Sequence, residues 1–134
     1  MLEVTDLTRT YGRGDAAHVA IDRVTLNIAQ RELVSIVGPS GCGKSTLLRC
    51  IAGLIPPTAG RVVLHGEPVQ HVPAGLAVVF QDYGRSLYPW LSARDNAALP
   101  LRRTTRGRTA RRKAADASLA AVGIPGIGDK YPWQ

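Results

Sequence analysis

Two stretches near the start of the chain alternate apolar and polar residues, as half-buried β-strands do. The first covers residues 2–11 and the second covers residues 19–28. A glycine-containing turn at residues 12–15 separates them. The pattern predicts a pair of antiparallel strands at the edge of a sheet.

Two continuous apolar runs predict a different kind of strand. Residues 33–37 read Leu-Val-Ser-Ile-Val, and residues 76–80 read Leu-Ala-Val-Val-Phe. Parallel strands that are covered on both faces have this composition. We therefore expect both runs to lie in a buried parallel sheet. A separate short strand is expected at residues 61–64.

Helical spacing of apolar residues predicts three helices. The first begins near Lys44 and ends before Gly53, a residue type favoured just past helix ends. The second covers residues 93–99, with Ser92 as its N-cap, and the third covers residues 108–122. The side chains expected to face inward are, in the first helix, Leu47, Leu48, Ile51 and Ala52, and in the third, Ala114, Ala115, Leu119 and Val122.

A glycine-rich turn joins the first apolar run to the first predicted helix. Residues 38–46 read Gly-Pro-Ser-Gly-Cys-Gly-Lys-Ser-Thr, which matches G-x-x-x-x-G-K-[ST], the phosphate-binding P-loop. A chance glycine turn is the alternative, but the strand before and the helix after that the motif requires are both predicted here. The expected phosphate-binding residues are Gly38, Pro39, Ser40, Gly41, Cys42, Gly43, Lys44, Ser45 and Thr46.

The spacing of the motif has a physical reason. Gly38, Gly41 and Gly43 permit positive φ angles, so the backbone N–H groups of the loop can point at phosphate oxygens. The helix that follows adds unpaired N–H groups and the positive end of its dipole. Lys44 can reach the β- and γ-phosphates, and the Ser45 hydroxyl is placed to ligate Mg²⁺.

Composition limits the class of protein. The 134 residues fit one domain of ordinary size, and 45% apolar residues suffice for a packed core. No apolar run approaches the roughly 18 residues that span a bilayer, and Glu3 and Asp6 interrupt any signal peptide. We therefore expect a chain in the cytosol, or at the cytosolic side of a membrane through a partner. The two cysteines have no metal-site or disulfide spacing; Cys50 is expected in the core and Cys42 as a small residue filling the turn.

Much of the net charge of +7 lies in residues 102–113, which contain no acidic side chain. One interpretation is a patch for nucleic acid or acidic lipid. The other is a solvated connector and helix face, which we favour because no aromatic residues interleave with the run to stack on bases. Nucleic acid is therefore not an expected partner.

Several motifs, in their order and intervals, resemble the ATP-binding subunit of ATP-binding cassette (ABC) transporters over essentially the whole chain. They are Tyr11, residues 38–46, Ile51-Ala52-Gly53-Leu54, Pro57-Thr58-Ala59-Gly60 and Val79-Phe80-Gln81-Asp82. Residues 81–91 most resemble the branch that serves nitrate, sulfonate and taurine importers.

The resemblance implies an α/β fold: a P-loop NTPase (RecA-like) core with an N-terminal antiparallel β subdomain and the start of a helical subdomain. Residues 1–82 would form the nucleotide-binding core and β subdomain, and residues 83–134 a partial helical subdomain. The core sheet is expected to be incomplete, because the family's second apolar strand, which ends in Asp-Glu, is not found in these residues.

The resemblance also implies ATP and Mg²⁺ as cofactors. Tyr11 would stack on adenine, Lys44 and Gln81 would carry catalytic roles, and Ser45 and Gln81 would hold Mg²⁺. Tyr11 as an ordinary strand-end tyrosine, and Gln81 as a polar strand terminus, are the alternatives.

The partners implied are a transmembrane permease, a periplasmic or extracellular solute-binding protein, and a second ATPase subunit in the full-length parent, at the cytoplasmic face of the cell membrane. Tyr88, Pro89, Trp90 and Leu91 are the local candidates for permease contact. The alternative is that Trp90 packs inside the helical subdomain.

Some family motifs are not found in these 134 residues. Neither the Leu-Ser-Gly-Gly-Gln signature, nor the aspartate and catalytic glutamate of the second strand, nor the switch histidine occurs. We therefore expect the N-terminal part of a longer importer ATPase. The alternatives are a non-catalytic nucleotide-binding module and a nucleic-acid-associated cassette protein.

Overall fold

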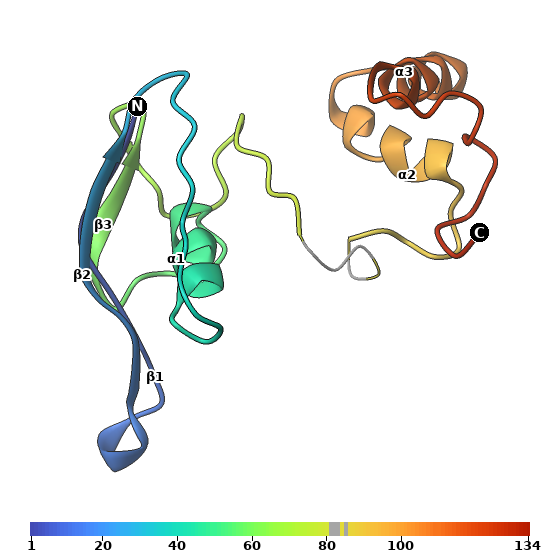
Figure 1. The fold of residues 1–134 in the computed structure, drawn as a ribbon. Helices are drawn as coiled ribbons and strands as arrows, with labels where there is room; N and C mark the ends of the chain where they lie inside the picture. Colours follow the sequence, from blue (N-terminus) through green and yellow to red (C-terminus); the bar gives the residue numbers. More distant parts are fainter. Residues whose placement is uncertain (81–83, 85) are drawn as a thin grey trace. The chain divides into compact units, whose positions relative to one another are not determined.

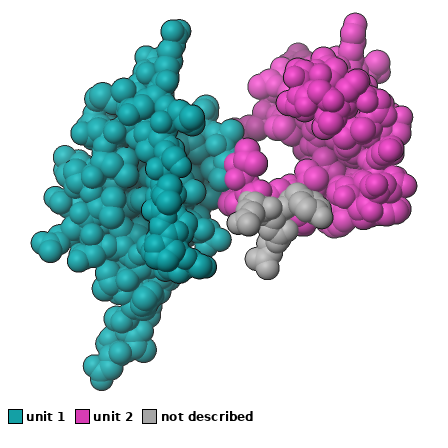
Figure 2. All heavy atoms as spheres, viewed as in Figure 1, with its two compact units in different colours: residues 1–78 teal, residues 79–134 magenta. Residues whose placement is uncertain are grey.

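The computed structural model describes residues 1–80, 84 and 86–134 of the chain. They form two compact units, Met1–Val78 and Val79–Gln134, which Figure 2 colours separately and which are described one at a time. The expected boundary between residues 82 and 83 lies outside the described residues.

The first unit is built on an antiparallel sheet with the strand order β2-β1-β3-β4 (Figure 1). β1 (Leu2–Tyr11) pairs with β2 (His18–Ile28) on one side and with β3 (Ala59–Leu64) on the other. A short 3₁₀ turn, η1 (Gly14–Ala16), closes the β1–β2 hairpin, and β4 (Glu67–Pro68) extends the sheet beyond β3. The two predicted antiparallel strands are confirmed. Their apolar and polar residues alternate because one face of the sheet is buried.

Helix α1 (Lys44–Ile51) packs on that face of the sheet. The shared core consists of Val4, Leu7, Ile21 and Val62 from the strands and Leu47, Cys50 and Ile51 from the helix. Cys50 is buried as predicted, but Leu48 is 53% exposed, so its predicted inward position is wrong. An eight-residue helix meets the sheet along one narrow stripe, and Leu48 lies beside that stripe.

The two apolar runs predicted as parallel strands are extended but are not strands. Residues 33–37 and 76–80 have no ladder pairing with any described residue. Leu33, Val37 and Val79 are 97%, 89% and 96% exposed. A strand needs a hydrogen-bonded neighbour as well as a suitable sequence, and the described part of the chain offers none to either run.

The second unit contains α2 (Ala93–Ala98), the 3₁₀ turn η3 (Pro100–Arg103) and α3 (Arg108–Ala121). Both helices were predicted, and Ser92 caps α2 by accepting a hydrogen bond from the Asp95 N–H at 3.2 Å. Ala115 is fully buried, whereas Val122 lies one residue past the end of α3 and is 71% exposed, against its predicted position.

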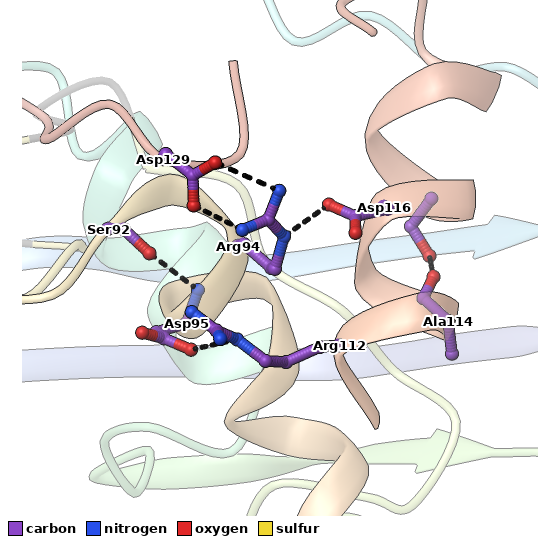
Figure 3. Close-up of polar contacts among 8 residues, drawn as sticks. Ser92, Arg94, Asp95, Arg112, Ala114, Asp116 and Asp129 are labelled. Atoms are coloured by element: carbon purple, nitrogen blue, oxygen red, sulfur yellow. Dashed lines mark hydrogen bonds and ion pairs between the residues drawn. The ribbon is translucent and has the colours of Figure 1, made fainter. Parts of the chain in front are cut away.

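Polar contacts connect the elements of the second unit (Figure 3). Arg94 on α2 donates from Nε to Asp116 on α3 at 2.6 Å, and its other nitrogens pair with Asp129. The buried Asn96 amide donates to the carbonyls of Tyr88, Leu91 and Ser92 at 3.0, 3.0 and 3.1 Å. These bonds fix the loop that enters α2.

Candidate functional site

The glycine-rich loop at residues 38–43 leads directly into the N-terminus of α1. Gly41 and Gly43 have φ angles of +83° and +94°, as the motif predicts. Gly38 does not have a positive φ, so it does not use the conformational freedom that glycine permits. Its lack of a side chain matters for another reason: a Cβ there would lie 2.8 Å from the sulfur of Cys42.

Gly43 holds the loop against the sheet. A Cβ at this position would overlap the carbonyl oxygen of Ala20, which lies on β2. Gly43 also has a left-handed backbone conformation. Position 43 therefore requires glycine for two independent reasons, the lack of space for a Cβ and the positive φ. The residue thus fixes both the turn of the loop and its distance from β2.

The ammonium group of Lys44 is turned back onto the loop. Its Nζ donates to the carbonyl of Gly38 at 2.7 Å and to that of Pro39 at 2.6 Å, and it lies 3.7 Å from the sulfur of Cys42. An ammonium has three donors, and all three are engaged by the loop. A positive charge is therefore held at the rim of the loop.

The first turn of α1 leaves N–H groups available for a ligand. Gly43 is the N-cap and supplies no side-chain acceptor, and no acidic residue lies in the first turn. The first intrahelical hydrogen bond runs from the Leu47 N–H to the Gly43 carbonyl at 2.8 Å. The N–H groups of Lys44, Ser45 and Thr46 therefore have no acceptor within the helix, and the positive end of its dipole is not neutralised.

A cavity of about 270 Å³ lies beside the loop. Its lining combines Ala20 to Asp22 and Val24 of β2 with Ile36 and Val37, with Cys42, Gly43 and Lys44 of the loop, and with Leu47 of α1. Ser45 is exposed and Thr46 is half-buried at the start of the helix. The nine P-loop residues are continuous, so the structure brings this part of the expected site together.

Of the two remaining expected site residues, the structure describes Tyr11. Tyr11 ends β1, pairs with His18 and is 37% exposed. The guanidinium carbon of Arg9 lies 4.8 Å from the centre of its ring, so one face of the ring already meets a cation. Gln81 lies outside the described residues.

Comparison with known proteins identifies the family of the chain. A family model described as ABC transporter matches residues 21–132. The chain belongs to the ABC transporter family. This ABC chain is 42% identical over 123 residues to the taurine import ATP-binding protein TauB of Sinorhizobium fredii, covering 92% of the chain and 45% of TauB. It is 41% identical over 128 residues to the nitrate import ATP-binding protein NrtD of Synechococcus elongatus, covering 94% of the chain and 46% of NrtD.

Solved structures agree with this assignment. The ATP-binding cassette MJ0796, in a dimeric post-hydrolysis state bound to ADP and Pi, superimposes with a TM-score of 0.84 at 33% sequence identity. The match covers 100% of this chain and 62% of that one. The fold is that of a P-loop NTPase cassette, and family membership implies nucleotide binding. The ABC chain spans about half the length of the curated relatives named above.

Two features of this ABC chain bear on its surface. Trp90 is 69% exposed, with its ring centre 5.2 Å from that of Tyr88, so the alternative in which Trp90 packs inside the helical unit is wrong. No helix in the described residues has both the length and the apolar character needed to cross a membrane.

Sequence reasoning missed the hydrogen bonds of Lys44 to its own loop, because no local pattern signals a side chain that folds back on two carbonyls.

Cys42 gives a chemical probe of the loop in the ABC chain. It is exposed, whereas Cys50 is buried, and burial raises the pKa of the Cys50 thiol against a smaller opposite effect of the Arg9 charge. We expect a thiol-alkylating reagent to modify Cys42 selectively and Mg-ATP to slow that reaction at least fivefold or so by covering the loop. Mass spectrometry of timed samples measures this. Equal labelling rates with and without Mg-ATP would contradict it, and Cys42→Ser is the matched control for the assignment.

Proposed function

We propose that residues 38–46 bind the phosphate groups of Mg-ATP, and that the chain is the ATP-binding part of an importer ATPase. The observation that carries the proposal is the combination of Lys44, held at the rim of the loop by Gly38 and Pro39, with a helix whose first turn contains no acidic residue. A triphosphate tail matches both features, because it supplies several negative oxygens to N–H donors and one ammonium.

Binding would exchange one set of partners for another. Lys44 would leave its carbonyl acceptors for the β- and γ-phosphates, and the N–H groups at the start of α1 would donate to phosphate oxygens. The exposed Ser45 hydroxyl fits a Mg²⁺ ligand, and Gln81 would be the second protein ligand and would help orient a water molecule. When bound, Mg²⁺ neutralises charge on the β- and γ-phosphates.

The adenine ring would stack on the face of Tyr11 that Arg9 does not cover. Tyr11 lies on a different element from the loop, so this contact would set the orientation of the nucleotide while the loop supplies most of the affinity. In this proposal Lys44 is the residue on which binding depends.

The transport role rests on the relatives. Those named for taurine and nitrate import share 41–47% identity with this chain, and we propose a nitrate-, sulfonate- or taurine-like solute for the parent transporter. A permease would contact the exposed ring of Trp90 and its neighbour Tyr88, at the cytoplasmic face of the membrane. A solute-binding protein and a second ATPase subunit would complete the parent assembly.

Isothermal titration calorimetry of the 134-residue chain with ATP and excess Mg²⁺ tests the proposal. We expect one site per chain with a dissociation constant on the order of 10–1000 μM, since the nucleotide meets the loop with little else to cover it. No heat with millimolar Mg-ATP on folded protein would refute the proposal. From the same sample we expect steady-state ATP hydrolysis below about 0.01 s⁻¹, which is far under ordinary enzyme rates. Such a low rate would favour the interpretation of the 134-residue chain as a non-catalytic nucleotide-binding module.

A further inference from the structure

The second unit contains a cavity of about 360 Å³ between α2, η3 and α3. Four arginines line it, Arg102 from η3 and Arg108, Arg111 and Arg112 from α3, together with one acidic residue, Asp95. Counted over the described lining, four arginines against one aspartate leave a net charge of +3 around a space of this size. Leu91, Ala98 and Leu99 supply the apolar part of the lining.

Two of the four arginines are held in place by the protein. Figure 3 shows Arg112 paired with Asp95. The Nε of Arg112 lies 3.2 Å from a carboxylate oxygen of Asp95, and both side chains are partly buried. Arg111 donates from Nη1 to the carbonyl of Thr105 at 3.2 Å. These contacts fix one wall of the cavity and use the one carboxylate that lines it among the described residues.

The other two arginines have no such restraint. Neither Arg102 nor Arg108 makes a side-chain hydrogen bond or ion pair with any described residue, yet both line the cavity. α3 also begins at the cavity with Gly107 as its N-cap, no side-chain cap, and no acidic residue in its first turn. Like charges gathered in one partly enclosed space repel one another, and a bound anion relieves that repulsion.

We propose that this arginine pocket, defined by Arg102, Arg108, Arg111 and Arg112, binds a compact phosphate group. Guanidinium groups pair with phosphate through two parallel N–H donors, and the volume admits a small phosphate-bearing group rather than a folded surface. The phosphate belongs either to a soluble phosphorylated molecule or to the headgroup of an anionic lipid. None of the described residues that line this pocket belongs to residues 38–46, so the proposal does not depend on nucleotide binding.

The test compares two variants of equal charge. Arg102→Gln/Arg108→Gln removes the two unrestrained arginines of the pocket, and Arg103→Gln/Arg106→Gln removes two exposed arginines of the same basic run that do not line it. All proteins, including the parent, also carry Lys44→Ala, so that the P-loop contributes equally little. The four substituted side chains are exposed, so the variants are expected to keep their fold.

Two probes distinguish the source of the phosphate. Inorganic pyrophosphate is titrated by calorimetry, and binding to phosphatidylglycerol vesicles is measured against phosphatidylcholine vesicles by co-sedimentation. We expect the pocket variant to bind at least one probe about tenfold more weakly than the parent, and the control variant to differ by less than about twofold. Selective loss with pyrophosphate supports a soluble ligand, and selective loss with vesicles alone supports a lipid headgroup. Equal loss in the two variants, or no binding of either probe by the parent, would overturn the proposal.

Discussion

Replacing Lys44 with alanine should lower the affinity for Mg-ATP by about a hundredfold. The substitution removes the one ammonium at the rim of the loop, which now bonds to the carbonyls of Gly38 and Pro39. It also removes the hydrogen bonds that those two carbonyl oxygens accept from the ammonium. Calorimetric titration with Mg-ATP measures the change.

A matched control separates this effect from a general loss of charge. Lys113 is exposed on α3 and lies outside the loop, so Lys113→Ala should bind Mg-ATP within about twofold of the parent. If both alanine variants retained the affinity of the parent, the assignment of Lys44 to the phosphates would be wrong.

Gly43→Ala should destabilise the first unit by about 2–4 kcal/mol and weaken Mg-ATP binding as well. Alanine at this position must adopt a φ of +94°, and its Cβ overlaps the carbonyl oxygen of Ala20 on β2. Relief requires the loop to move away from the sheet, which also moves the N–H groups at the start of α1. Urea unfolding, followed by circular dichroism, gives the free energy of unfolding.

Gly66 provides the comparison for Gly43, because it too has a positive φ, of +86°, but an added Cβ there meets nothing within 4 Å. Gly66→Ala therefore carries the conformational cost alone, about 1 kcal/mol. The difference between the two variants measures the close approach of the loop to β2. Equal destabilisation of the two would show that the approach has no energetic weight.

The elements that the sequence predicted correctly are those with a local cause. The β1–β2 hairpin follows from alternation, α2 from its cap at Ser92, and the end of α1 from Gly53, which has a φ of +69°. Residues 33–37 have an equally clear strand pattern, yet strand formation depends on a neighbour that composition cannot supply. The local sequence pattern therefore predicted backbone conformation well, but it did not predict which segments pair as strands.

In the candidate site, too, the features with a local cause were predicted and those that depend on distant contacts were not. The P-loop is one continuous segment, so its motif alone brings Lys44 and its neighbours together. The cation beside Tyr11 and the convergence of Arg102 and Arg108 on one cavity depend on contacts between separate elements. Charge counting found the basic run but could not tell which arginines share a space, because that depends on how η3 and α3 turn relative to each other.

Residues 33–37, which lead into the P-loop, give the chain a further property. They form an extended apolar edge whose backbone groups bond to no other described residue. An edge of this kind accepts a strand from any chain that presents a matching face, including a second copy of itself. We therefore expect the 134-residue chain to self-associate increasingly as its concentration rises, through the same segment that leads into the phosphate-binding loop.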